Sequence, residues 1–323
     1  MSVEVRSATL GDVPEIVAVF RSNVRKWRTF AVLGRRYLPY ERLTLLQRYR
    51  NGGPWMAPET CALHIQQVQA SGNLALVAVH GGRVAGYSGL LFSHEPAPWG
   101  HNAKLDTIYV HKDLQRKIGA GTALIQTIER EARAAGCNIL WAYKIARGAG
   151  PFYARCGFVP LLNQVRVTLR ARQFPLSFDA EPLAHPPGYA SDLPLVIGHY
   201  ASSQWLWASP ERWRVEARAL PDVFQRIEPI CFRLRITPAS GDPPSDSSAY
   251  VYLIPEFRRA YASVLAWTRS GDVLPVVQAI VTVARRMKFR KVHLLFQEAD
   301  WLTIHEAFTP LKTRPNVPHF KQL

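Results

Sequence analysis

Apolar residues in the first half of the chain alternate between strand-like and helix-like spacing. Two apolar runs at residues 74–80 and 83–92 flank Gly81-Gly82, which is the signal of a β-hairpin. The other predicted elements are an edge strand at 3–6, a helix that starts at Thr9 or Asp12, a strand at 105–110, a helix at 122–135, a strand at 138–143, a short helix around Phe152 and a last strand at 164–169. This order predicts a mixed α/β fold with a central mixed sheet flanked by helices.

The second half repeats much of this order after a proline-rich stretch. Prolines at 175, 182, 186, 187 and 194 exclude a long regular element there. Beyond them we expect helices at 211–220, 272–287 and 301–308 and strands at 231–236, 249–254, 260–268 and 291–296. A chain of 323 residues suits two domains better than one. The predicted division is a first domain at 1–172, a linker at 173–195 and a second α/β domain at 196–323.

A basic glycine loop lies at residues 116–121, between a predicted strand and a predicted helix. Gly119 and Gly121 allow the backbone to bend sharply and to approach a ligand closely. The unpaired amides and the dipole at the start of the helix favour an anion such as a pyrophosphate. The dinucleotide fingerprint fails because Leu124 stands where its third glycine belongs, and no Walker motif follows. A G-x-G before a helix also occurs in plain turns.

Two short motifs surround the helix at 122–135. Residues 116–121 match the pattern Gln/Arg-x-x-Gly-x-Gly/Ala, and residues 149–158 match Ala-x-x-Phe-Tyr-x-x-x-Gly-Phe. Together with the order of elements, they resemble the acyl-coenzyme A site of the GNAT superfamily of N-acetyltransferases. The resemblance implies acetyl-CoA as co-substrate and no metal. The cofactor-binding residues that it implies are Ile108, Tyr109, Val110, Arg116, Lys117, Ile118, Gly119, Ala120, Gly121, Thr122 and Phe152.

The resemblance covers about the first half of the chain. The order of elements in the second half suggests a tandem copy, a second GNAT-like domain. Its loop at 269–272 lacks the second glycine and the basic pair, and it carries Asp272, which disfavours an anion. We therefore expect the second domain to be degenerate.

Amide formation requires a neutral amine that attacks a thioester and a proton for the departing thiolate. By the resemblance, Tyr153 is the candidate general acid. We propose Asp106, on the strand before the loop, as the candidate base, acting directly or through water. Each residue also has a purely structural interpretation. Tyr153 would then be part of the core, and Asp106 would cap or solvate the end of a strand. Many family members have an asparagine where this chain has Ala146, so one cofactor hydrogen bond is lost or supplied elsewhere.

The formal net charge of +16 favours anionic partners. A basic cluster with interleaved aromatic residues contains Arg21, Arg25, Lys26, Arg28, Arg35, Arg36, Arg42, Arg48 and Arg50. This composition fits the binding of single-stranded nucleic acid. It also fits the solvated faces of early helices that shape an acceptor site, which is the interpretation we favour. The acceptor would then be acidic or carry phosphate.

Four scattered cysteines without C-x-x-C spacing argue against a zinc site or a disulfide framework and fit a reducing cytoplasm. The first residues lack the apolar core of a signal peptide, and no stretch has the length and apolarity of a membrane helix. The leading hypothesis is a cytoplasmic N-acetyltransferase whose amine acceptor, a small molecule or a peptide, attacks acetyl-CoA directly in a ternary complex. An inactive acyl-CoA-binding regulatory module and a basic nucleic-acid-binding protein on the same scaffold are alternatives. The sequence also leaves open whether the protein forms a homodimer.

Overall fold

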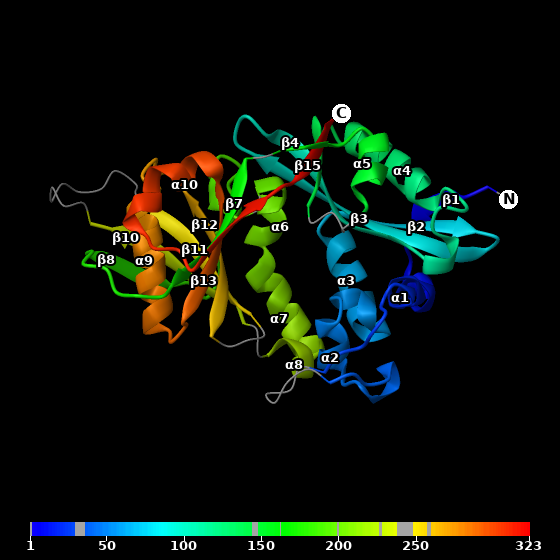
Figure 1. Cartoon of the computed structure of the whole chain (residues 1–323), viewed down its shortest axis with the longest axis horizontal. Coiled ribbons are helices and arrows are strands. Elements are labelled where there is room, and N and C mark those ends of the chain that lie inside the picture. Colours follow the sequence, from blue (N-terminus) through cyan, green and yellow to red (C-terminus); the bar gives the residue numbers. More distant parts are fainter. Residues whose placement is uncertain are drawn as a thin grey trace.

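The computed structural model of the chain describes residues 2–29, 36–143, 148–161, 163–198, 200–225, 228–237, 248–256 and 260–323. Its strands form two sheets, each packed against helices (Figure 1). The predicted mixed α/β class is therefore confirmed for both halves. The predictions that concern Ala146 and Arg35 fall outside the described ranges.

The first sheet has the strand order β1-β2-β3-β4-β5-β15-β6. Its strands are β1 (Glu4–Ser7), β2 (Leu74–His80), β3 (Arg83–Glu95), β4 (Gly100–Val110), β5 (Ile139–Ala142), β15 (His319–Gln322) and β6 (Val159–Pro160). Strands β4 and β5 run parallel to each other, whereas β3 is antiparallel to both β2 and β4. The predicted edge strand and hairpin are confirmed, and the strand predicted at 105–110 begins earlier, at Gly100.

Helices cover both faces of the first sheet, because alternate residues of its strands point to opposite sides. Ala75 and Val77 of β2 share a core with α1 and α3, whereas Leu76 and Ala78 share a second core with α4 and α5. The predicted helix at 122–135 is α4. The helical segments of this half are α1 (Val13–Ser22), α2 (Leu45–Arg50), α3 (Pro58–Ala70), α4 (Ala120–Ala134), α5 (Gly150–Arg155), η1 (Leu10–Asp12), η2 (Tyr40–Arg42), η3 (Pro54–Met56) and η4 (Lys112–Leu114).

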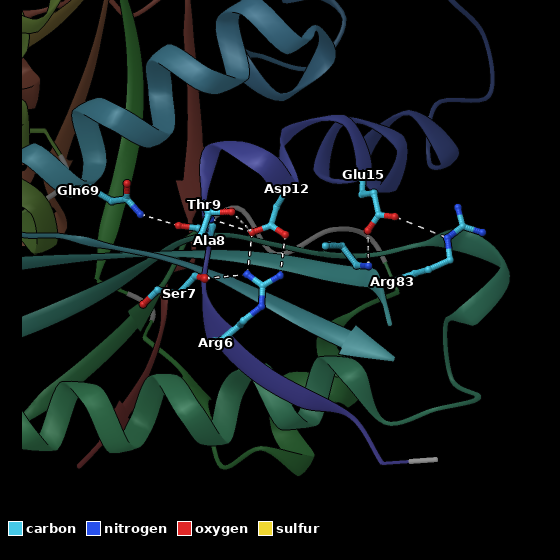
Figure 2. A network of polar contacts seen from close by, with 9 residues as sticks. Arg6, Ser7, Ala8, Thr9, Asp12, Glu15, Gln69 and Arg83 are labelled. Atoms are coloured by element: carbon cyan, nitrogen blue, oxygen red, sulfur yellow. Dashed lines mark hydrogen bonds and ion pairs between the residues drawn. The ribbon is translucent and has the colours of Figure 1, made fainter. Parts of the chain in front are cut away.

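A polar network holds α1 against the edge of the sheet (Figure 2). Arg6 of β1 donates two hydrogen bonds of 2.7 Å to the carboxylate of Asp12, and the Thr9 hydroxyl donates to the same carboxylate. The Arg6 hydrogen bonds lower the pKa of Asp12 to about 2, so this carboxylate is charged at neutral pH. Glu15 of α1 accepts a hydrogen bond from the backbone N–H of Val84 in β3. The network fixes the helix whose far end lies at the cleft described below.

The second sheet has the order β14-β7-β13-β12-β11-β10-β8, and β9 pairs with β12. Its strands are β7 (Gln164–Arg170), β8 (Phe178–Pro182), β9 (Leu195–Ile197), β10 (Ile230–Ile236), β11 (Ser248–Pro255), β12 (Tyr261–Thr268), β13 (Lys291–Gln297) and β14 (Lys312–Asn316). Helix α9 (Val273–Arg286) buries its apolar face against this sheet, and α10 (Glu298–Ile304) and η6 (His305–Ala307) follow β13. The strands and helices predicted for this half are therefore confirmed.

The two sheets exchange their last strands. The sequence predicts residues 164–169 as the final strand of the first domain. That assignment is wrong, because β7 pairs with β13 and β14 in the second sheet. The C-terminal strand β15 takes a place in the first sheet instead, between β5 and β6. Figure 1 shows β15, in red, reaching across to the half that contains α4 and α5. Residues near the C-terminus are thus part of the first half.

Three helices lie between the halves, namely α6 (Ser203–Trp207), α7 (Ser209–Ala219) and α8 (Pro221–Phe224), just after η5 (Tyr200–Ser202) (Figure 1). The Phe224 ring of α8 meets the Tyr49 ring of α2 edge-on, with centroids 5.2 Å apart. The Trp205 ring lies near the His64 imidazole of α3, with centroids 6.4 Å apart. The second half therefore packs on the helices that border the cleft. None of the described helices is both long and apolar enough to span a membrane.

Candidate active site

Strands β4 and β5 diverge and open a cleft in the first sheet. Their parallel pairing covers only residues 102–105 and 139–142. Asp106, the next residue of β4, forms a β-bulge opposite the Gly89–Leu90 step of β3, which bends the strand at this point. A cleft of about 1750 Å³ runs from here along β4 to the start of α4. The backbone of β4 beyond the bulge therefore borders the cleft instead of pairing with β5.

The glycine loop brings the start of α4 to one end of the cleft. Gly119 caps α4 in the left-handed conformation, with φ 75°, and Arg116 also has a positive φ of 63°. A Cβ on Gly121 would lie 3.3 Å from Cζ of Phe152 in α5, so glycine allows α5 to approach the first turn of α4. The first amides of α4 have no partner within the helix and border the cleft. This end has the form of an anion site.

The cleft brings together most of the residues predicted from the sequence. Those that line it are Asp106, Ile108, Tyr109, Val110, Arg116, Gly119, Ala120, Gly121, Thr122, Phe152 and Tyr153. Two predicted cofactor residues do not line it. The Lys117 side chain is exposed to solvent, and Ile118 packs on the core beneath α4. The loop therefore presents Arg116, and not Lys117, to the cleft.

Asp106 lies in a confined polar corner of the cleft. Its carboxylate is 3.7 Å from Nζ of Lys104 and 4.0 Å from Nε2 of His64, and the Asp106 side chain is 20% exposed. Burial lowers the pKa of His64 to about 4, so its imidazole is neutral at pH 7. The only charged contact of Asp106 among the described side chains within 4 Å is therefore Lys104. Among the described side chains within 4.0 Å of this carboxylate, one is an ammonium group and one is a neutral imidazole.

Tyr153 lies on α5 with only 7% of its surface exposed. Its ring packs edge-on against Phe152 and Phe158, with centroids 5.4 Å away in each case. Burial raises the pKa of Tyr153 to about 12, so the phenol stays protonated across the physiological range. Both interpretations of this residue apply, because it belongs to the core and also lines the cleft.

An aromatic wall faces the candidate residues and was not predicted from the sequence. The rings of Phe20 and Trp55 stack with centroids 4.9 Å apart, and the Tyr109 ring lies 4.6 Å from Phe20. Trp55 meets His64 edge-on at 5.1 Å. These residues come from α1, η3, β4 and α3, so no local motif connects them. The apolar face of α1 and the Pro54-Trp55 pair were visible signals, but neither indicated a shared site.

Six residues of the basic cluster fall into two sets in the structure. Arg25, Lys26, Arg28 and Arg50 line the cleft, together with Lys104, Arg116 and Arg155. The guanidinium carbons of Arg21 and Arg48 lie over the ring of Tyr40, at 3.5 Å and 4.3 Å from its centroid. Four residues of the cluster thus face the cleft, whereas Arg21 and Arg48 cover the ring of Tyr40, an aromatic residue of the same segment.

Strands β12 and β13 of the second sheet diverge as β4 and β5 do, but another strand, β9, fills the gap between them. Strands β12 and β13 pair in parallel over three residues only. Strand β9 then pairs with β12 at Ala266 and Trp267, and Gly198 just after β9 donates a backbone hydrogen bond of 2.9 Å to Leu295 of β13. At the start of α9, the Asp272 side chain accepts from the Leu274 amide, so a carboxylate occupies that helix terminus. Among the residues described in the second half, β9 therefore fills the split, and Asp272 caps the helix start that corresponds to α4.

Residues 41–158 match the model of the acetyltransferase (GNAT) family. A GCN5-related N-acetyltransferase from Kribbella flavida shares 12% identity and a TM-score of 0.57, over 100% of this chain and 71% of that one. Another from Anabaena variabilis shares 12% identity and a TM-score of 0.54, over 98% of this chain and 72% of that one. No curated protein sequence matches the chain. At these identities the structures show a common fold and no more. Residues 41–158 are therefore similar to acetyltransferases of the GNAT family, and the two-sheet fold of the whole chain is shared with these two GCN5-related N-acetyltransferases.

Proposed function

We propose that the protein is an N-acetyltransferase that transfers an acetyl group from acetyl-CoA to a primary amine. The observation that carries this proposal is the split between β4 and β5, which leads from Asp106 to the free amides at the start of α4. An extended, amide-containing pantetheine arm could pair with a strand edge of this kind. The phosphates would then reach the helix terminus.

The residues at the loop end fit a coenzyme A molecule. Gly121 leaves space beside Phe152 that a side chain would fill, and Arg116 adds a cation next to the α4 amides. Ile108, Tyr109 and Val110 of β4 would lie along the pantetheine arm. Acetyl-CoA supplies an activated thioester carbonyl, and the amine would attack it directly in a ternary complex.

Tyr153 would act as the general acid toward the departing thiolate. A donor must carry its proton beforehand, and a pKa of about 12 keeps the phenol protonated. A thiolate that leaves into the same poorly solvated region is also destabilised, which favours proton transfer to sulfur. The limited exposure of Tyr153 requires the sulfur to come deep into the cleft.

Asp106 would act as the base for the amine, directly or through a water molecule. It lines the cleft at the bulge where β4 and β5 part. Lys104 and His64 lie within 4.0 Å and would hold the carboxylate in place. Because His64 is neutral, it can accept or donate a hydrogen bond without adding charge.

The decisive experiment measures thiol release from acetyl-CoA with a panel of primary amines. The Tyr153→Phe variant should lose at least about tenfold in kcat while its Kd for acetyl-CoA, from titration calorimetry, changes little. Tyr109→Phe is measured alongside it, because Tyr109 is a second tyrosine that lines the cleft, is 40% exposed and is the rival candidate for the acid. Unchanged turnover in Tyr153→Phe together with a loss in Tyr109→Phe would transfer the acid role to Tyr109.

One observation favours a second candidate function. Tyr153 is packed among Phe152 and Phe158 like an ordinary core residue. A domain that binds acyl-CoA for regulation, without catalysis, would need the loop and the split but no exposed acid. Stabilisation by acetyl-CoA with no turnover on any amine would support this function.

The nucleic-acid alternative has weaker support. Trp27 and Tyr40 contact each other edge-on, and Tyr40 also lies under two arginines of the chain. Base stacking needs open aromatic faces beside the cations. We therefore assign the cations that line the cleft to a small anionic ligand.

A further inference from the structure

We propose that the acceptor amine also carries a carboxylate or phosphate group, bound by a cationic wall formed by Arg25, Lys26, Arg28 and Arg50. This inference rests on the proposed N-acetyltransferase function and narrows its substrate class. Arg25, Lys26 and Arg28 lie just after the end of α1, and Arg50 is the last residue of α2. All four side chains line the cleft.

The charge of the cleft is strongly one-sided. Among the described residues that line it, seven are lysine or arginine, and Asp106 is the one carboxylate. Lys104 lies 3.7 Å from that carboxylate, so the two largely neutralise each other. A surplus of cations on a concave surface raises the local concentration of anions. The cleft therefore selects ligands of net negative charge.

The cations come from two different parts of the chain. Arg116 and Arg155 flank the α4 start, where Phe152 meets Gly121, and they suit the cofactor phosphates. Arg28 lies in the loop after α1, and Arg50 is the last residue of α2. This wall continues through Asn51 and Gly52 to Trp55. Because Trp55 contacts His64 and His64 lies 4.0 Å from Asp106, the wall reaches the corner where the amine would react.

The side chain of Asn51 holds the wall at Arg28 through two hydrogen bonds to the backbone. The Arg28 amide donates to Oδ1 of Asn51 at 3.0 Å, and Nδ2 of Asn51 donates to the Arg28 carbonyl at 2.9 Å. This reciprocal pair ties the loop after α1 to the end of α2. In the described parts of the chain, the guanidinium groups of Arg25 and Arg28 form no ion pair. Two cations held on an ordered loop without carboxylate partners are available to a ligand.

Matched pairs of amines test the proposal, because the members of a pair differ in one anionic group. Suitable pairs are O-phosphoethanolamine with ethanolamine, L-glutamate with L-glutamine, and L-aspartate with L-asparagine. Turnover is measured by thiol release from acetyl-CoA. Binding of each amine to the protein saturated with CoA, which cannot react, is measured by titration calorimetry. We expect the anionic member to be favoured at least about tenfold in kcat/KM, or in Kd for the CoA complex.

The Arg28→Glu variant should remove this preference, while its Kd for acetyl-CoA changes less than about threefold. Arg42→Glu is the matched control, since it makes the same charge change at an exposed residue that does not line the cleft. It should keep the preference.

Three outcomes would overturn the proposal. Equal turnover and equal binding of both members refute an anionic acceptor but leave the acetyltransferase function intact. A large loss of acetyl-CoA affinity in Arg28→Glu assigns the wall to the cofactor phosphates instead. Absence of acetyl-CoA binding to the wild type refutes the proposed function itself, and with it the acceptor site.

Discussion

Nζ of Lys321, in the last strand of the chain, lies 2.6 Å from Oε1 of Glu129 in α4. The same ammonium group donates to the carbonyl oxygen of Cys156 at 2.9 Å. One C-terminal side chain thus joins α4 to the end of α5, the two helices that border the candidate cofactor site. A Cβ on Gly157 would come 3.2 Å from the Lys321 stem, so glycine also makes room for this contact.

We predict that Lys321→Ala destabilises the protein. The side chains of Lys321 and Glu129 are 23% and 18% exposed, so the loss leaves a carboxylate and a carbonyl with little access to water. The free energy of unfolding from urea titration should fall by about 1–3 kcal/mol. Lys312→Ala is the control, because Lys312 of β14 is exposed to solvent. Equal stability of the two variants would show that the exchanged strand is held by its backbone pairing alone.

Acetyl-CoA should raise the melting temperature of the wild type but not of Gly121→Glu. Ligand at about 100 times its Kd stabilises by about 2.7 kcal/mol, which corresponds to roughly 5–10 °C for a domain of this size. The glutamate would bring negative charge to the phosphate end and would clash with Phe152, since even a Cβ lies 3.3 Å from that ring. Gly188→Glu is the control, because a Cβ there meets no atom within 4 Å. A shift that survives in Gly121→Glu would place the cofactor elsewhere.

Each chain should bind one molecule of acetyl-CoA. In the second half, β9 occupies the gap between β12 and β13, and Asp272 caps α9. Titration calorimetry of the wild type should give a stoichiometry of about one, and Gly121→Glu should bring it near zero. A stoichiometry of two would mean that β9 leaves the gap when ligand is present.

The buried Glu95 should make stability depend on pH. Its carboxyl group is 1% exposed and accepts hydrogen bonds from the Ser93 hydroxyl and, across the two halves, from the Ser203 amide. Burial raises the pKa of Glu95 from 4.5 to about 8. Between these values the folded state holds a proton that the unfolded state has lost, so stability falls as the pH rises from about 4.5 to about 8 and then levels.

Glu95→Gln tests this dependence because glutamine keeps an acceptor for both donors but does not titrate. Urea unfolding is measured at several pH values. Relative to the wild type, the free energy of unfolding of the variant should rise by on the order of 3 kcal/mol between pH 5 and pH 8. The difference should be constant above that range. Parallel profiles for the two proteins would show that Glu95 keeps an ordinary pKa.

The local elements could be predicted well because they depend on neighbours in the sequence. The hairpin of β2 and β3 follows from apolar alternation around Gly81-Gly82, and α4 follows from its amphipathic repeat. The loop at 116–121 indicated an anion site through its glycines, and Gly119 does take a left-handed conformation that few other residues tolerate. Such features need only a few adjacent residues to be specified.

Long-range pairing decided the rest. Nothing in the alternation of residues 164–169 states which sheet they join, because a strand edge can pair with any compatible edge. The exchange of β7 and β15, the filling of the second gap by β9 and the meeting of Phe20, Trp55, His64 and Asp106 all join segments far apart in the chain. The sequence by itself determined local features such as the hairpin of β2 and β3, helix α4 and the glycine loop at 116–121. Only the tertiary structure decided which cations face the cleft and which strand fills the second gap, because charge and burial depend on every segment packed around a site.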